Sequence, residues 1–73
     1  MAREIKLLDT VALLQDLPKA RLQRGQVGTI VEELAPGVFE VEFSDDQGRT
    51  YASRAVESTR LLGPLYEAVG SAE

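Results

Sequence analysis

Residues 24–33 read RGQVGTIVEE and place two glycines at the start of an apolar run. Gly25 follows a polar loop, where its freedom to adopt a positive φ lets the chain reverse tightly. Gly28, close to the start of the apolar residues, indicates either a β-bulge or the close approach of another backbone. Both features bend a strand early, as the curvature of a small sheet requires. The segment therefore predicts a strand in a small, strongly coiled β-sheet.

The clearest periodicity follows at residues 38–43, VFEVEF. Phe39, Val41 and Phe43 share one face, and two glutamates alternate with them on the other, which is typical of a half-buried strand. A slip of one residue would bury both carboxylates, so the register is strongly specified. Both phenylalanines are therefore expected in the core.

Turn signals divide the rest of the chain into short segments. Pro36-Gly37 fits a type II turn, and residues 44–48, SDDQG, fit a hairpin loop closed by glycine. Leu22 is the expected anchor of a loop over residues 19–24. We predict strands at residues 7–14, 27–33, 38–43, 49–55 and 60–62, and a short helical turn at residues 56–59. Residues 7–14 also show helical spacing, so a helix is the alternative there.

The composition bounds the class of protein. A chain of 73 residues makes one domain that buries only about 60% of its unfolded surface. It contains no Cys and no His, so it lacks thiolate chemistry, disulfides and the commonest general base and metal ligand. Neither a signal peptide nor an apolar run of membrane length is visible, which predicts a cytoplasmic location without membrane contact.

Charge is distributed unevenly along the chain. The net charge is −4, and residues 1–24 carry an excess of two bases, whereas the remainder carries an excess of six acids. An acidic balance disfavours nucleic acid, whose binding normally needs a basic patch. The one basic concentration is the loop at residues 19–24. The candidate partner-binding residues are Lys19, Arg21, Arg24, Tyr51 and Tyr66.

Several motifs keep the order and spacing of a known family. The spacing GxxGxI at residues 25–30 resembles the KOW type of SH3-like barrel. Together with it, LDTV (8–11), DLP (16–18), FEVEF (39–43), DQGRT (46–50) and LGP (62–64) resemble a family of small bacterial SH3-like proteins classed as a domain of unknown function. The resemblance covers about residues 7–64. It implies a bacterial, cytoplasmic protein and lends no catalytic residue. In SH3-like barrels the corresponding long loop commonly borders a ligand surface, so the resemblance makes the loop at residues 19–24 the first candidate partner site.

The predicted architecture is all-β, a small SH3-like, partly open barrel of about five short antiparallel strands. Residues 1–6 are expected to be a flexible leader, residues 7–64 the barrel and residues 65–73 a C-terminal tail. An open barrel exposes a strand edge, which predicts either a monomer or a homodimer paired through that edge.

Independent catalysis is not expected. Asp45-Asp46 suits the early positions of a turn and lacks the further spaced ligands of a calcium loop, and a small barrel is filled by its own side chains. We predict no catalytic residue, no cofactor and no metal. With two Phe, two Tyr and no Trp, the chain also lacks the aromatic groove that proline-rich peptides need.

The expected function is that of a non-catalytic SH3-like protein-interaction module with a protein partner. Two alternatives are an accessory or chaperone-like subunit of an enzyme and a weak KOW-like RNA binder. The first alternative is motivated by the same fold and by an apolar tail, and the second predicts steep salt dependence of binding.

Overall fold

A computed structural model describes residues 5–64. Residues 1–4 of the expected leader and the whole expected tail lie outside the described residues. The elements are β1 (Thr10–Leu13), a 3-10 turn η1 (Pro18–Ala20), β2 (Val27–Ala35), β3 (Val38–Ser44), β4 (Thr50–Glu57), a 3-10 turn η2 (Ser58–Arg60) and β5 (Leu61–Leu62).

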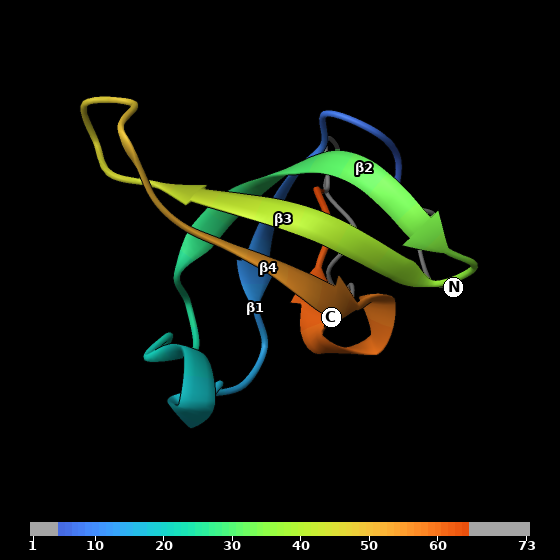
Figure 1. The fold of residues 1–73 in the computed structure, drawn as a ribbon, viewed down its shortest axis with the longest axis horizontal. Coiled ribbons are helices and arrows are strands. Elements are labelled where there is room, and N and C mark those ends of the chain that lie inside the picture. The colour runs from blue at the N-terminus through green and yellow to red at the C-terminus, as the bar shows by residue number, and fades with distance from the viewer. Residues whose placement is uncertain (1–4, 65–73) are drawn as a thin grey trace, which may run out of the picture.

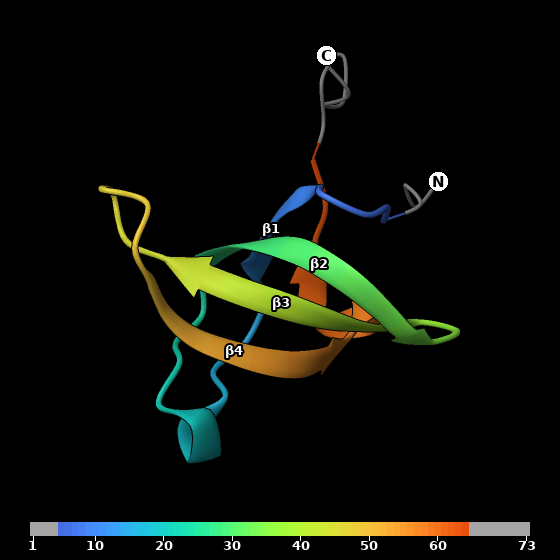
Figure 2. The same ribbon diagram turned by 45° about the horizontal axis from the view of Figure 1, so that its top comes forward.

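The five strands form one antiparallel sheet in the order β4-β3-β2-β1-β5. β2, β3 and β4 lie side by side as a curved layer, and β1 crosses behind them (Figures 1 and 2). The last strand returns to pair with the first, Leu61 opposite Leu13 and Leu62 opposite Ala12. β4 and β5 remain the two edges, so the sheet is not closed into a barrel. The prediction of an all-β domain with about five short antiparallel strands is confirmed.

Two predicted turns join β2 to β3 and β3 to β4. Gly37 (φ +77°) and Gly48 (φ +83°) both adopt the left-handed conformation that glycine accepts without steric cost. Gly28 forms no bulge: it pairs directly with Phe43 at a close approach of the two strands. The bulges in β2 occur later, between Ile30 and Glu32 and between Glu33 and Ala35.

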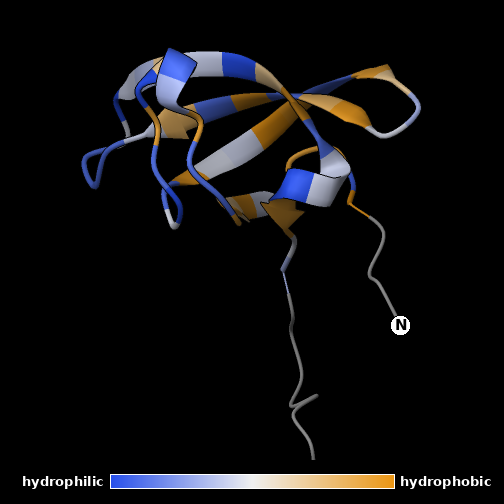
Figure 3. Ribbon diagram, turned by 90° about the horizontal axis from the view of Figure 1, so that it is seen from below, coloured by the Kyte–Doolittle hydropathy of each residue, from blue (hydrophilic) through white to orange (hydrophobic). Residues whose placement is uncertain are grey.

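Strand alternation builds the core. On β3 the burial pattern alternates strictly, with Phe39, Val41 and Phe43 buried, as predicted. Apolar and polar residues alternate visibly along the strands (Figure 3). The core is completed by residues from the other elements, namely Val11, Leu13, Leu22, Ile30, Val56 and Leu61.

Several strand boundaries differ from the prediction. The first strand covers only Thr10–Leu13, and the helical alternative for this segment is wrong. The helical turn expected at residues 56–59 is also misplaced, since β4 runs on to Glu57 and η2 begins at Ser58. The reason is that Val56 pairs with Phe39 and is buried against it, which extends the ladder by two residues.

No helix in residues 5–64 has the length and apolar character needed to cross a membrane.

Candidate binding groove

The segment between β1 and β2 is tied to the core by one leucine. Leu22 is 3% exposed and belongs to the core cluster, as predicted for the anchor of this loop. Its backbone N–H donates to the Leu17 carbonyl at 3.1 Å, and the Leu17 N–H donates back at 2.8 Å. Between them lies η1, which Arg21 ends at φ 59°, in the left-handed region. The segment is therefore a closed turn, and Lys19 lies within it.

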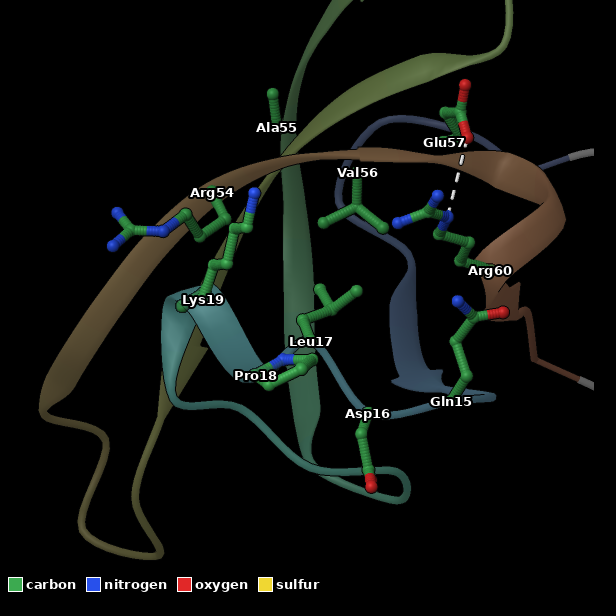
Figure 4. Close-up of a pocket in the computed structure, with 11 residues that line it drawn as sticks. Gln15, Asp16, Leu17, Pro18, Lys19, Arg54, Ala55, Val56, Glu57 and Arg60 are labelled. Atoms are coloured by element: carbon green, nitrogen blue, oxygen red, sulfur yellow. Dashed lines mark ion pairs between the residues drawn. The ribbon is translucent and has the colours of Figure 1, made fainter.

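An open groove of about 650 Å³ separates this turn from the end of β4 (Figure 4). Its volume falls within the range of about 300–1,000 Å³ that is typical of ligand sites. Residues 15–20 line one side, residues 54–57 line the other, and Arg60 adds to the lining. The side chains of Leu17 and Val56 point toward each other across it (Figure 4).

The groove follows the edge of β4 rather than one of its faces. Alternate side chains of a strand point to opposite faces, and residues 54–57, which line the groove, are consecutive. Within residues 5–64, β4 pairs with β3 alone. The groove therefore borders the side of the strand where its backbone has no neighbouring strand.

Two acidic side chains of the groove are already engaged. The Glu57 carboxylate oxygen Oε1 lies 3.4 Å from the Arg60 guanidinium nitrogen Nε, the ion pair drawn in Figure 4. Asp16 accepts the backbone N–H of Arg24 on its Oδ1 at 2.9 Å. Each carboxylate is therefore bound by another group of the same chain. Neither carboxylate forms an ion pair with the remaining basic side chains of the groove.

Lys19 and Arg54 are those remaining bases. Within residues 5–64 neither forms an ion pair with a carboxylate. Arg54 instead donates from Nη1 to the carbonyl oxygen of Ser53 at 3.1 Å. In Figure 4 Lys19 reaches toward β4 near Arg54, at the opposite end of the groove from Arg60. A chain with a net charge of −4 thus presents a local excess of positive charge beside an unpaired strand edge.

One of the five predicted partner-binding residues lines the groove. Lys19 does so, whereas Arg21 and Arg24 are exposed on the same segment but outside the lining. Tyr51 is 49% exposed at the start of β4, and its hydroxyl accepts a hydrogen bond of 2.9 Å from a loop glutamine. Tyr66 lies outside the described residues. Of the three basic residues predicted in this loop, one therefore lines the groove and two lie outside it.

The sequence interpretation missed Arg54 and Arg60 as companions of Lys19. For Arg54, the pairing register of β4 shows why this residue belongs to the groove. Phe43 pairs with Ala52, so counting by twos along β4 puts Arg54 on the core-facing side of an edge strand. A charge in that position is a known device for guarding an exposed edge.

The loop between β3 and β4 is organised by Asp45. Its Oδ1 accepts the backbone N–H groups of Gln47 and Arg49, both at 2.9 Å, and its Oδ2 lies 3.2 Å from Nε of Arg49. The backbone N–H of Arg49, followed by that of Gln47, lowers the pKa of the Asp45 carboxyl below its ordinary value. Asp45 thus acts as a turn residue. Within residues 5–64, no group of three or more acidic side chains is placed to hold a metal ion.

These features define a small all-β domain with an open sheet and a groove along one edge. Residues 7–62 match the model of a family described as Domain of unknown function (DUF4926), and the chain belongs to this family. No curated protein and no solved structure matches the chain.

Proposed function

We propose that this protein is a non-catalytic protein-interaction module that holds a segment of a partner protein in the groove between residues 15–20 and β4. The observation that carries the proposal is the pair Lys19 and Arg54, two bases without a carboxylate partner in residues 5–64, beside an unpaired edge. The last strand, β5, pairs with the first strand, β1, and this pairing supports an SH3-like arrangement. The bacterial and cytoplasmic setting belongs to the same proposal.

The lining of the groove favours a protein segment over nucleic acid. None of its eleven residues is aromatic, whereas single-stranded nucleic acid is normally held by stacking its bases on aromatic side chains. Its apolar members are small or aliphatic and come from both sides, which suits packing against aliphatic side chains. Two bases also make a short positive track compared with the extended stripe that a phosphate backbone requires.

Affinity capture from native lysate tests this function. The tagged protein is compared with Lys19→Glu/Arg54→Glu, which reverses the two groove bases, and with Arg21→Glu/Arg24→Glu, which makes the same charge change outside the groove. The expected result is a protein that the second variant retains at physiological salt and the first loses. The captured partner, once purified and added to this protein, is then expected to shift the NMR signals of residues 15–20 and 54–57.

Three outcomes contradict the proposal. One is capture of nucleic acid alone, released at physiological salt; another is loss of the partner only with Arg21→Glu/Arg24→Glu; the third is unchanged binding by both variants. If the partner is an enzyme, its activity with and without this protein distinguishes simple docking from an accessory-subunit role.

A further inference from the structure

Hydrogen bonds outside the strands reveal which backbone groups of β4 face the groove. Ser58 donates its N–H to the carbonyl of Gly37 at 2.8 Å, which continues the register in which Glu57 faces Val38. In an antiparallel ladder, directly opposed pairs alternate between bonded and non-bonded. Counting by twos from Ser58 therefore turns the backbone groups of residues 56, 54 and 52 toward β3.

The opposite side of the sheet gives the same assignment. Ile30 donates its N–H to Asp9, toward β1, at 2.9 Å, so the groups of its neighbour Thr29 point toward β3. Thr29 faces Glu42, and the residues on either side of Glu42 therefore turn to β4. The backbone groups that turn to the open edge, where no strand pairs with them, include those of Ser53 and Ala55.

One of these edge groups is covered by the chain itself. The Ser53 carbonyl, which points away from β3 by this count, accepts the hydrogen bond from Nη1 of Arg54 at 3.1 Å. Arg54 thus occupies an acceptor that an added strand would use. Lys19, which faces it across the groove, adds a second positive charge at the same end.

We propose that β4 accepts an acidic, extended segment of a partner protein as a sixth strand, and that a carboxylate of this segment draws the Arg54 guanidinium away from the Ser53 carbonyl. The inference rests on the proposed function and names its mode of binding. Main-chain bonds to Ser53 and Ala55 supply affinity, as in other cases of strand addition. The requirement for a carboxylate supplies selectivity, because a segment without one leaves the edge covered.

A second copy of this chain fits the edge less well. Antiparallel pairing of two β4 strands about their middle brings the two Arg54 side chains close together, and like charges facing each other across strands are destabilising. The only carboxylate on β4, that of Glu57, is paired with Arg60. A register shift between Phe43 and Ser44 also interrupts the ladder near Tyr51, which shortens the regular edge.

Selection from a displayed library of random eight-residue peptides, with the full chain as bait, tests the charge requirement. The expected result is enrichment of Asp or Glu among alternating aliphatic residues. An enriched peptide made synthetically is expected to slow hydrogen exchange at the amide of Ala55 and to lose at least tenfold in affinity when its carboxylates are replaced by amides. Enrichment without acidic residues, or no enrichment, overturns the proposal.

Ala55→Pro tests strand addition itself. It removes the outward N–H and no bond to β3, a position where an edge strand tolerates proline. Ala55→Ser keeps the N–H and is the matched control. We expect at least a tenfold loss of peptide affinity for Ala55→Pro and a change of less than twofold for Ala55→Ser. A peptide methylated at every second amide nitrogen makes the same test on the wild-type protein, so the result does not depend on folding of the proline variant.

The binding results distinguish failure of strand addition from failure of the proposed function. If Ala55→Pro and the methylated peptide bind normally while Lys19→Glu/Arg54→Glu does not, the groove binds a protein segment but not as a strand. If all of these bind normally, the groove is not the site. If a dimer forms through β4 at the concentration used, and peptide does not dissociate it, the second copy is the occupant and the acidic segment is excluded.

Discussion

A β-carbon built on Gly28 would lie 2.6 Å from Cγ1 of Val41, deep in the contact between β2 and β3. It would also lie 2.8 Å from the carbonyl oxygen of Glu42, which is backbone and cannot rotate away. The two strands can approach this closely only because residue 28 has no side chain.

Gly28→Ala is therefore expected to lower the free energy of unfolding by about 1–3 kcal/mol, the usual cost of overpacking a core. Urea denaturation followed by circular dichroism measures the change. Gly48→Ala is a useful comparison, since a β-carbon there meets no atom within 4 Å but suffers from the positive φ. An unchanged midpoint for Gly28→Ala would show that the strands separate without cost.

Leu22→Ala should remove the anchor of the turn that carries Lys19. Leu22 is 3% exposed, and truncation of such a leucine costs about 2–5 kcal/mol. Thermal unfolding gives the stability, and amide exchange at Leu17, whose N–H donates to Leu22, reports the turn directly. Leu14→Ala serves as control because Leu14 is 45% exposed. Equal losses for both variants would mean that the turn is not held by this anchor.

Replacement of Leu8 by glycine is expected to stabilise the protein. Leu8 has φ +70° and is 72% exposed, so its side chain adds left-handed strain and little burial. Relief of this strain raises the free energy of unfolding by about 1 kcal/mol. The greater flexibility of glycine in the unfolded chain offsets part of this gain. Leu7→Gly, at a position without positive φ, should not stabilise. A fall in the melting temperature of Leu8→Gly would contradict the expectation.

Asp45→Asn should make stability less dependent on pH. The N–H groups of Arg49 and Gln47 favour the charged form of Asp45 and lower its folded pKa, so the charged carboxylate adds stability above the pKa of an unfolded aspartate, about 3.9. This contribution is lost as the pH falls through the lowered folded pKa. Wild type should exceed Asp45→Asn in stability at neutral pH, and the difference should shrink on acidification. Asp46→Asn is the control, and identical pH profiles for wild type and Asp45→Asn would refute the assignment.

Much of the fold could be predicted because its determinants are local. Strict alternation at Phe39, Val41 and Phe43 specifies one strand, and glycines at two turns specify its connections. The end of β4 differs from the prediction for a non-local reason. Val56 and the polar residues after it suggest a turn, yet pairing with Phe39 buries Val56 and keeps the chain extended.

The candidate site was less accessible to sequence reasoning. Residues 19–24 form a basic cluster in the sequence, but their direction depends on how the turn closes between Leu17 and Leu22. Of the three bases in this cluster only Lys19 lines the groove, which it shares with Arg54, a residue 35 positions further along the chain. Local charge content therefore points to this loop but does not distinguish the residue that lines the groove from its neighbours.

The pairing of Ala12 with Leu62 joins positions 50 residues apart, and this affects the order of events during synthesis. Contacts of such long range form slowly compared with local hairpins, whereas β2, β3 and β4 follow one another directly and can pair as they leave the ribosome. Residues 60–62 leave it later. A growing chain therefore leaves the outer edge of β1 exposed until the last strand has arrived, whereas the edge of β4 beside Arg54 stays open in the finished sheet as well.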